Sequence, residues 1–300
     1  MVTSPRIIIL GSSNTDLVLN CARLPKPGET LLGGEFHRYA GGKGANQAVA
    51  AARAGARVVM IGARGDDEFG RTALAGLRAE KVDTRHFQKT TKAPSGVALI
   101  LLGGKTRENV IAVAKSANDT VSIQSVRAAR DEFAKARVVV AQLEVPLPAV
   151  QEAARQARRA GVPFLLNPAP ARDLPRTLLR LVDTLTPNEH EAALLTGIDD
   201  PEKAAQDLIK MGCRRVVVTL GARGVLLADE QGSRYFRTRK VKAVDTVGAG
   251  DCFMGWFAAG LAEGLSIDEA IPRALQAATI SVTRAGAQPS FPRRNEVRRE

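Results

Sequence analysis

Short runs of β-branched and other apolar residues alternate with longer segments rich in Ala, Leu and Arg along most of the chain. The apolar runs predict strands at residues 6–10, 57–61, 137–141, 162–166, 182–185 and 215–220. The longer segments predict helices at residues 45–54, 68–80, 125–135, 148–160, 189–196 and 201–211. Alternation at this spacing is typical of βαβ units. The pattern therefore predicts a three-layer α/β fold, in which helices cover both faces of a central, mainly parallel sheet.

Two strand-prone segments, residues 17–39 and 96–113, interrupt this alternation. The second has two apolar arms around Gly103 and Gly104, which is a hairpin signal. We expect the two segments to form a small β-sheet beside the active-site edge, which closes over a small substrate as a lid. Because no linker rich in Pro or Ser divides the chain, residues 1–300 are predicted to form a single domain.

The 300 residues carry a formal net charge of +12, which fits either a nucleic-acid surface or an anionic substrate such as ATP. The basic residues are spread along the chain and only 4% of the residues are aromatic, which argues against a nucleic-acid partner. No apolar run approaches the roughly 20 residues that span a bilayer, so we expect no membrane segment and a cytoplasmic protein. Three separated cysteines agree with this location, and neither they nor the three histidines have metal-site spacing.

Residues 245–251, Asp-Thr-Val-Gly-Ala-Gly-Asp, form a glycine-rich turn directly before an apolar segment that reads as a helix. Gly248, Ala249 and Gly250 lack bulk, so their backbone N–H groups can approach an anion closely. The start of the helix adds unpaired N–H groups and a positive dipole end. Asp251 then stands where a phosphate in transfer would meet an attacking hydroxyl group. The alternative is that Asp251 only caps the helix.

Polar residues follow two of the predicted strands. Asn14 and Asp16 come just after the first strand, and Glu144 follows the strand at 137–141. Because ligands bind at the carboxyl ends of parallel strands, these side chains are candidates for binding hydroxyl groups. Taken alone, Asn14 and Asp16 fit a simple turn slightly better, since both residue types favour turns for local reasons.

A second glycine-rich stretch, residues 40–48, precedes an Ala-rich helix. Gly41, Gly42 and Gly44 allow close backbone approach to a ligand, while Lys43 and Asn46 add hydrogen-bond donors. The stretch is not a Walker A loop, because the Gly-x-x-x-x-Gly-Lys-[Ser/Thr] pattern is absent. The polar residues favour a ligand site over a plain strand-to-helix turn.

Two further motifs follow strands in the second half of the chain. Asn188 and Glu191 share a face at the start of a helix, where they could orient Mg²⁺ and its waters near phosphates. A capping box made by the same two residues is compatible with that role. Residues 219–224, Thr-Leu-Gly-Ala-Arg-Gly, suit nucleotide phosphates or a ribose, although a plain hairpin turn fits them equally well.

In combination, these motifs resemble those of the ribokinase (pfkB) family of carbohydrate kinases. Residues 41–46, Gly-Gly-Lys-Gly-Ala-Asn, match the N-terminal family signature, and residues 245–251 match the C-terminal one. The resemblance covers nearly the whole chain, with the motifs in order and at the expected separations. It implies the three-layer fold with a β lid, and a homodimer, because the lid often serves as a dimer interface in this family.

The resemblance also implies a role for each matching residue. Asp251 would be the base that accepts a proton from the sugar hydroxyl. Gly248, Ala249 and Gly250 would form the anion hole. Besides Asp251, the sugar contacts would be Asn14, Asp16, Gly42, Lys43, Asn46 and Glu144. The nucleotide contacts would be Asn188, Thr219, Gly221, Gly224 and Gly250.

The family pattern also implies two ions. Asn188 and Glu191 match an element associated with magnesium and phosphate. A potassium-like cation would lie beside the anion hole, several of its ligands being backbone carbonyl groups. The matching positions are Asp245, Val247, Ser281, Arg284, Gly286 and Ser290.

The chain departs from the family pattern in two places. Cys252 and Met254 stand where the family often has a smaller or polar residue, and residues 114–118 lack a glycine expected before Ala117 and Asn118. Both departures lie near the sugar contacts rather than on them. They therefore put affinity in doubt more than the type of reaction.

The expected reaction is transfer of the γ-phosphoryl group of ATP to the 5-hydroxyl group of D-ribose, with Mg²⁺ and K⁺ as cofactors. Fructose, 2-keto-3-deoxygluconate or a nucleoside are alternative acceptors. A nucleoside would need an apolar base pocket, and Phe36 and Tyr39 are the only Phe, Tyr or Trp residues in the lid segments. A sugar acid would favour an added Arg, such as Arg107. A catalytically silent sugar or nucleotide sensor is the alternative from another class, against which Asp251 and the anion hole argue.

Overall fold

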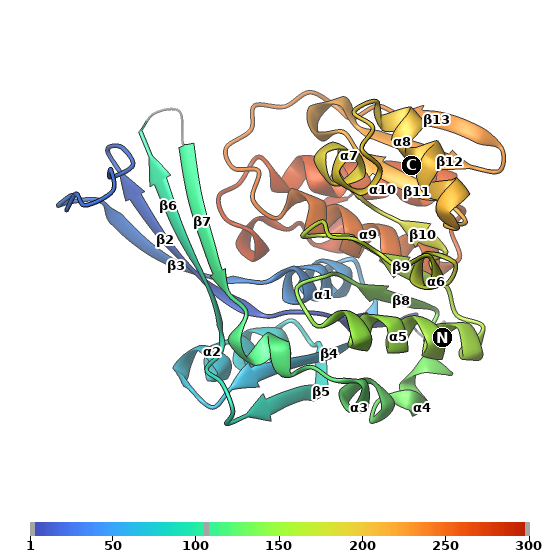
Figure 1. The fold of residues 1–300 in the computed structure, drawn as a ribbon, viewed down its shortest axis with the longest axis horizontal. Coiled ribbons are helices and arrows are strands. Elements are labelled where there is room, and N and C mark those ends of the chain that lie inside the picture. Colours follow the sequence, from blue (N-terminus) through green and yellow to red (C-terminus); the bar gives the residue numbers. More distant parts are fainter. Residues whose placement is uncertain (1–3, 105–107, 298–300) are drawn as a thin grey trace.

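The computed structural model describes residues 4–104 and 108–297, which form a large sheet, a small sheet and the helices around them (Figure 1). The large sheet has nine strands in the order β5-β4-β1-β8-β9-β10-β11-β12-β13. In that order, the strands are Asp83–Thr90, Arg57–Gly65, Arg6–Leu10, Val138–Ala141, Phe164–Leu166, Thr184–Leu185, Val216–Thr219, Val225–Asp229 and Gly232–Phe236. Neighbouring strands from β5 to β11 pair in parallel, whereas the β11–β12 and β12–β13 pairs are antiparallel. The prediction of a mainly parallel central sheet is confirmed.

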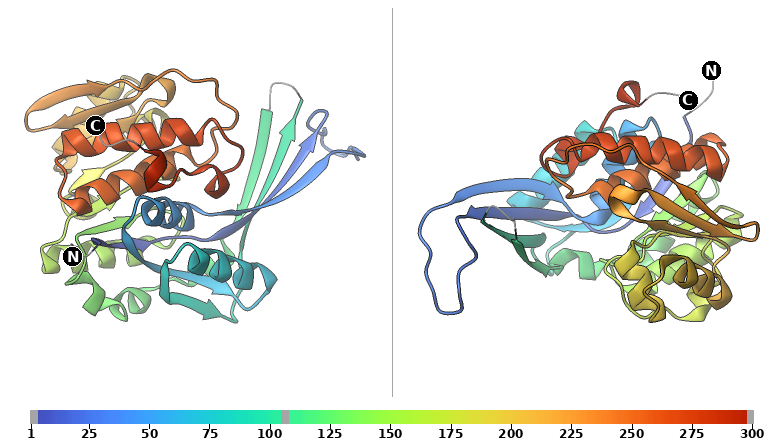
Figure 2. Two further views of the ribbon diagram at one scale, coloured as in Figure 1. Left: turned by 180° about the vertical axis from the view of Figure 1, so that it is seen from behind. Right: turned by 90° about the horizontal axis from the view of Figure 1, so that it is seen from above.

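Helices cover both faces of the large sheet, as the sequence predicts (Figure 2). Helices α3, α5 and α8 pack on one face, and α1, α9 and α10 pack on the other. The helices are α1 (Lys43–Arg53), α2 (Glu68–Ala79), α3 (Ile123–Arg127), α4 (Arg130–Phe133), α5 (Leu147–Ala160), α6 (Arg176–Leu179), α7 (Glu189–Thr196), α8 (Pro201–Met211), α9 (Ala249–Glu263) and α10 (Ile267–Ser281). Within residues 4–104 and 108–297, every helix is too short or too polar to traverse a bilayer.

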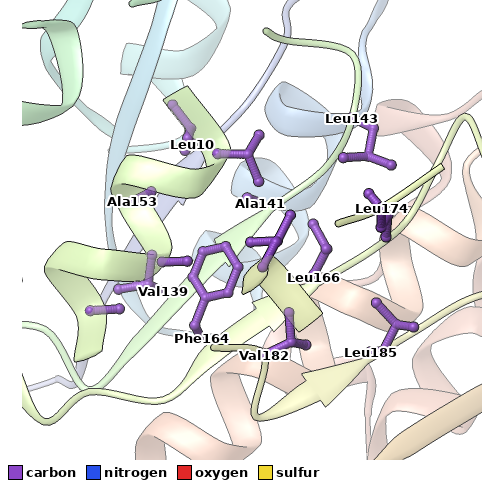
Figure 3. Close-up of a cluster of buried hydrophobic side chains, with 14 of the residues drawn as sticks. Leu10, Val139, Ala141, Leu143, Ala153, Phe164, Leu166, Leu174, Val182 and Leu185 are labelled. Carbon is purple, nitrogen blue, oxygen red and sulfur yellow. The ribbon is translucent and has the colours of Figure 1, made fainter. Parts of the chain in front are cut away.

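The central strands of the large sheet are buried on both faces, which explains their continuous apolar sequences. In β1, Ile8 and Leu10 join the hydrophobic core on one face, whereas Ile7 and Ile9 join the core on the other. Figure 3 shows part of the first core, where Phe164 of β9 lies among side chains of β8 and α5. The two cores hold the carboxyl ends of the central strands in place, and several predicted site residues, such as Asn14, Glu144 and Asn188, follow those ends.

The small sheet projects from one side of the molecule, apart from the helical layers (Figures 1 and 2). Its strand order is β3-β2-β6-β7, formed by Glu35–Gly41, Asn14–Cys21, Gly96–Gly103 and Glu108–Ala114. The two inner strands, β2 and β6, pair in parallel, and both outer pairs are antiparallel. Strand β2 begins at Asn14, earlier than the predicted insertion at 17–39, so Asn14 and Asp16 belong to a strand. The interpretation of these two residues as a simple turn is wrong.

Some elements differ from the sequence prediction for identifiable reasons. The single helix predicted at 125–135 is wrong, because the chain breaks into α3 and α4 near Ala129. Val126, Ala129 and Phe133 all face the same core, so the apolar periodicity continues across the break and hides it. Strands β5 and β13 lie at the edges of the large sheet and have polar sequences, so no apolar run marked them.

Candidate active site

A pocket of about 190 Å³ lies where the carboxyl ends of the central strands meet the first turns of α1, α7 and α9. This is the expected place for a ligand in an open parallel sheet. Its lining brings together predicted residues from motifs far apart in the sequence. They are Lys43, Asn188, Glu191, Thr219, Gly248, Ala249, Gly250 and Asp251. The lining also includes Asn167, Thr186 and Thr246, which the sequence did not single out.

Asp251 is buried in this pocket, with 7% of its surface exposed. The N-cap of α9 is Gly248, with a φ of 76°, and Asp251 lies inside the first turn. The carboxylate makes no capping hydrogen bond. It accepts one hydrogen bond from Asn46 Nδ2 and one from Gln47 Nε2, both 3.0 Å long. The interpretation of Asp251 as a helix cap is therefore wrong. In the first turn, the Ala249 N–H donates to the Thr246 carbonyl group at 3.2 Å, and helix geometry leaves the N–H groups of Gly250 and Asp251 for another acceptor.

The carboxylates of Asp16 and Glu144 lie close enough to Asp251 to affect one another. Burial, followed by the charges of Glu144 and Asp251, raises the pKa of Asp16 from 3.8 to about 7. Burial alone would lower the pKa of the Lys43 ammonium. The charges of Asp251, Glu144 and Glu191 outweigh burial and raise it. The site is thus an acidic cluster around one lysine, which suits a ligand rich in hydroxyl groups.

The turn before α1 fits closely around this cluster. Glu144 accepts hydrogen bonds from the Ser12 hydroxyl group and, at 3.0 Å, from the backbone N–H of Lys43. A Cβ atom at Gly41 would lie 2.1 Å from Asp16 Oδ2, so any side chain there would displace the carboxylate. This steric requirement explains the glycine at position 41.

Asn14 is held by a residue to which the sequence assigned no role. The buried Asn118 donates from Nδ2 to Asn14 Oδ1 at 2.8 Å, and its own Oδ1 accepts the backbone N–H of Ser13 at 2.9 Å. Asn118 therefore fixes the orientation of the Asn14 amide. An amide within a short 3₁₀ segment carries no sequence signal for such a role.

The motif at the start of α7 forms the predicted capping box. Asn188 Oδ1 accepts the N–H of Glu191 at 2.7 Å, and Glu191 Oε2 accepts the N–H of Asn188 at 2.9 Å. Burial raises the pKa of Glu191, although the Asn188 N–H and the Lys43 charge favour its charged form. Asn188 also bridges to Thr219 at the end of β11, which joins this motif to the glycine loop at 219–224. That loop links β11 to the antiparallel β12, so the hairpin interpretation of its backbone is correct.

A second pocket, of about 540 Å³, continues from this loop and has a largely apolar lining. It is formed by Gly221, Ala222, Thr238, Arg239, Lys240, Val241, Ala243, Thr246, Ala249, Ala278, Thr279 and Val282. Of these, Gly221 and Ala222 belong to the loop at 219–224, and Thr246 and Ala249 belong to the motif at 245–251. The others come from the connection before α9 and from the end of α10, and no periodic pattern links those segments before folding brings them together.

The predicted cation residues lie in two segments that Asp245 ties together. Asp245 Oδ1 accepts the N–H of Val247 at 3.0 Å, and Oδ2 accepts the N–H of Gly286 at 2.9 Å. The hydroxyl groups of Ser281 and Ser290 donate to nearby backbone carbonyl groups, and Arg284 pairs with Glu296. Because the side chains of Asp245, Ser281, Arg284 and Ser290 already make these contacts, the oxygen atoms that the six positions could offer a cation are mainly backbone carbonyl oxygens.

Comparison with known proteins agrees with the resemblance to carbohydrate kinases. A family model for pfkB family carbohydrate kinases matches residues 4–294. The chain belongs to the pfkB family of carbohydrate kinases. It is 43% identical to a ribokinase of Haemophilus influenzae over 296 residues, covering 97% of this chain and 96% of that protein. It is 36% identical to a deoxyribokinase of Salmonella typhi, covering 95% of each. A structure of Arabidopsis thaliana ribokinase complexed with ribose and ATP is 30% identical, with a TM-score of 0.89, covering 98% of this chain and 97% of that one.

The departures of this pfkB-family chain can now be located. Cys252 is fully buried in the core, and burial raises the pKa of its thiol to about 12, so it is chemically inert. Met254 lines the pocket and its sulfur accepts a hydrogen bond from Thr186. The glycine expected before Ala117 corresponds to Ser116, which has a φ of 49°. A serine in this left-handed conformation is strained by about 1 kcal/mol, whereas a glycine would not be.

Proposed function

We propose that the protein transfers the γ-phosphoryl group of ATP to the 5-hydroxyl group of D-ribose. The observation that carries this proposal is the position of the buried Asp251 carboxylate. It lies in the first turn of α9, close to the acidic cluster that includes Asp16 and Glu144. The likeness to a ribokinase at 43% identity and to the ribose- and ATP-bound Arabidopsis enzyme supports ribose as the acceptor.

In the proposed mechanism, the protein positions the two substrates and supplies a proton acceptor. The sugar contacts are Asn14, Asp16, Gly42, Lys43, Asn46 and Glu144. Asp251 accepts the proton of the 5-hydroxyl group as the hydroxyl oxygen attacks the γ-phosphorus. The bond from the γ-phosphorus to the bridging oxygen of the β-phosphate breaks, and ADP leaves. The backbone N–H groups at Gly248, Ala249 and Gly250 stabilise the charge that spreads over the phosphoryl oxygens. Because this transition state is loose, alignment of the two groups matters more than the strength of the base.

We place ATP across the two neighbouring pockets. The phosphates would lie near Asn188, Thr219 and the turn at Gly250, and the loop with Gly221 and Gly224 would lead to the apolar pocket, which suits an adenine ring. Asn188 and Glu191 offer the oxygen ligands that Mg²⁺ prefers, and magnesium would neutralise phosphate charge there while keeping most of its waters.

We also propose a monovalent cation such as K⁺ at the two segments joined by Asp245. The hydrogen bonds from Val247 and Gly286 fix the loop in front of α9, and an ion bound there would further stabilise the turn that forms the anion hole. Its ligands would come from Asp245, Val247, Ser281, Arg284, Gly286 and Ser290.

Measurement of ADP release tests the proposal directly. D-ribose, 2-deoxyribose, fructose, 2-keto-3-deoxygluconate and adenosine are compared, each with and without K⁺. We expect kcat/KM for ribose to exceed every other value by at least about tenfold, which corresponds to roughly 1.4 kcal/mol of discrimination. We also expect K⁺ to raise the rate with ribose. Equal rates with all five acceptors, or ATP turnover that no acceptor stimulates, would contradict the proposal. The candidate donor for a sugar acid, Arg107, lies outside the described residues.

We propose that the small sheet acts as a lid and that its outer face is the interface between two copies of this chain. Phe36, Leu99 and Val110 alternate with the residues that face the site, and they are 63%, 55% and 52% exposed. Neighbouring exposed apolar side chains of this kind indicate an interaction surface. The proposed location of the enzyme is the cytoplasm, which supplies ATP, and cell fractionation would test it.

Introducing a charge on this face tests the dimer. Leu99→Glu is expected to convert a dimer into monomers, as measured by light scattering, because a buried unpaired carboxylate opposes association. Leu194→Glu on α7 is the control, since Leu194 is 61% exposed and α7 lies apart from the small sheet (Figure 1). A wild-type protein that is monomeric at micromolar concentration would contradict the proposal.

A further inference from the structure

A chain of buried side-chain amides leads from β8 to Asp251. Gln47 and Gln142 have no exposed surface. Gln142 Nε2 donates to Gln47 Oε1 at 2.5 Å, and Gln47 Nε2 donates to Asp251 Oδ1 at 3.0 Å. Gln47 Nε2 also donates to Asn167 Oδ1 at 3.2 Å. None of the roles proposed above uses Gln47 or Gln142.

The direction of these hydrogen bonds is fixed by chemistry. An ionised carboxylate can only accept hydrogen bonds, so Gln47 must turn its NH₂ group toward Asp251. Its oxygen then faces Gln142, which must supply a donor. If the Gln47 amide were reversed, its oxygen would oppose Asp251 Oδ1 and Asn167 Oδ1 at hydrogen-bond distance. The amide dipoles of Gln142 and Gln47 therefore both point toward Asp251 and strengthen one another.

Gly11, which follows β1, makes room for this chain. A Cβ atom at position 11 would lie 2.0 Å from Gln142 Oε1 and 2.7 Å from the backbone of Gly44. Any larger residue there would push Gln142 away from Gln47. Four elements (β1, β8, α1 and α9) thus contribute to the orientation of one carboxylate.

The two oxygens of Asp251 have different partners. Oδ2 is bound by Asn46, which also holds Gln288 and is a proposed sugar contact. Oδ1 is bound by Gln47, which lies behind the carboxylate and does not line the pocket. With one donor on each oxygen, the plane of the carboxylate is fixed. Without Gln47, the carboxylate could rotate about the bond that joins it to Cβ.

We propose that Gln47 is a positioning residue for phosphoryl transfer and that Gln142 sets the orientation of its amide. This inference rests on the proposed role of Asp251 as proton acceptor. Gln47 contacts neither substrate. It acts by holding Oδ1 so that Oδ2 meets the attacking hydroxyl group at the required angle. A misplacement of about 1 Å at such a centre can cost on the order of 10²-fold in rate.

The test is Gln47→Met, which keeps the length of the side chain and removes its donors. We expect kcat at saturating ribose and ATP to fall about 10- to 100-fold, with the same fall in the single-turnover rate. The Kd for ribose should stay within about threefold, because the residues proposed to contact the sugar are unchanged. A folded Gln47→Met protein with wild-type kcat, or one whose only change is a weaker Kd, would overturn the inference.

Gln142→Met is the second variant, and it keeps the inference testable if Gln47→Met does not fold. It should lower kcat in the same direction by a smaller factor, and the double variant should be no slower than Gln47→Met alone, since both changes break one chain. Independent, multiplicative effects would argue against coupling through Gln47. Ser125→Ala is the matched control. Ser125 is buried and hydrogen-bonded to Gln88, outside the residues placed in the site, so its loss should lower Tm and leave kcat unchanged.

The outcome can be separated from failure of the proposed function. If Asp251→Asn retains near wild-type activity, the role of Asp251 fails and the inference about Gln47 fails with it. If Asp251→Asn is inactive and Gln47→Met has wild-type kcat, only the inference about Gln47 fails.

Discussion

Asp251→Asn is expected to lower kcat by about 10³–10⁴-fold, while the Kd for ribose changes only a few-fold. An amide cannot accept the proton of the attacking hydroxyl group, and general-base catalysis typically contributes 10²–10⁴ to the rate. The upper part of that range applies here because Asp251 is buried. Within residues 4–104 and 108–297, Glu191 is the only other carboxylate that lines this pocket, and it is engaged with Asn188. Steady-state assay and calorimetric titration of ribose measure the two quantities.

The same variant has a structural effect that must be measured beside it. Asn46 and Gln47 both donate to the carboxylate, but an asparagine offers a single acceptor oxygen. One buried donor loses its partner, so unfolding should become easier by about 1–3 kcal/mol. Asp207→Asn on α8, away from the pocket, is the control and should change neither activity nor stability. Near wild-type kcat in a folded Asp251→Asn protein would refute the assignment.

Asp16→Asn is expected to reduce kcat/KM for ribose by about 10²–10⁴-fold. The loss corresponds to two hydrogen bonds to a charged group, at roughly 1.5–3 kcal/mol each. The wild-type enzyme should bind ribose more tightly as the pH rises from 6 to 8, because the pKa of Asp16 is about 7 and only the ionised form accepts both bonds. In Asp16→Asn, the KM for ribose should lose the part of its change between pH 6 and 8 that comes from ionisation of Asp16.

The raised pKa also predicts that Asp16→Asn stabilises the ligand-free protein. The pKa of Asp16 is 3.8 ordinarily and about 7 in the folded protein, so between these values the folded state holds a proton that the unfolded chain has released. The stability that this proton confers is complete below pH 4. It falls as the pH rises, and above pH 7 the buried charge destabilises the fold. The free energy of unfolding of the variant should therefore exceed that of the wild type by about 1–3 kcal/mol at pH 8, and the difference should vanish toward pH 4.

Denaturant unfolding at the two pH values measures this difference without added sugar. Glu108→Gln on β7 is the control, because Glu108 is an exposed carboxylate of the same sheet. A variant less stable than the wild type at pH 8 would mean that Asp16 makes favourable contacts in the empty site that its buried charge does not cancel.

The sequence was sufficient to predict the main architecture because parallel strands buried on both faces have continuous apolar runs. It also located the two glycine-rich turns, since their composition is unusual for the residues that precede a buried helix. Strands β5 and β13 escaped detection because an edge strand needs no apolar run. The division between α3 and α4 escaped for the opposite reason, since both pieces face one core.

The parts of the site that could not be predicted depend on contacts between distant segments. Asn118, Gln47 and Gln142 are amides whose neighbours are defined only after folding, and an amide inside a strand end or helix has no distinctive pattern. The apolar pocket likewise joins residues near 221, 240 and 280, and the segments near 240 and 280 carry no motif in isolation. Spacing along the chain reveals turns and periodic faces, but it does not reveal which polar groups meet in the interior.

Asp16 and Asn14 are part of β2, the strand that begins the small sheet, whereas Asp251 and the proposed anion hole lie at the start of α9. If these two side chains bind the sugar as proposed, the small sheet cannot swing outward as a rigid body without withdrawing them from it. Under the proposed role as a lid, sugar occupancy and lid position are then a single equilibrium. Opening of the lid would expose the product and, in the same movement, remove the contacts of Asn14 and Asp16 with it. Product release would then need no separate signal.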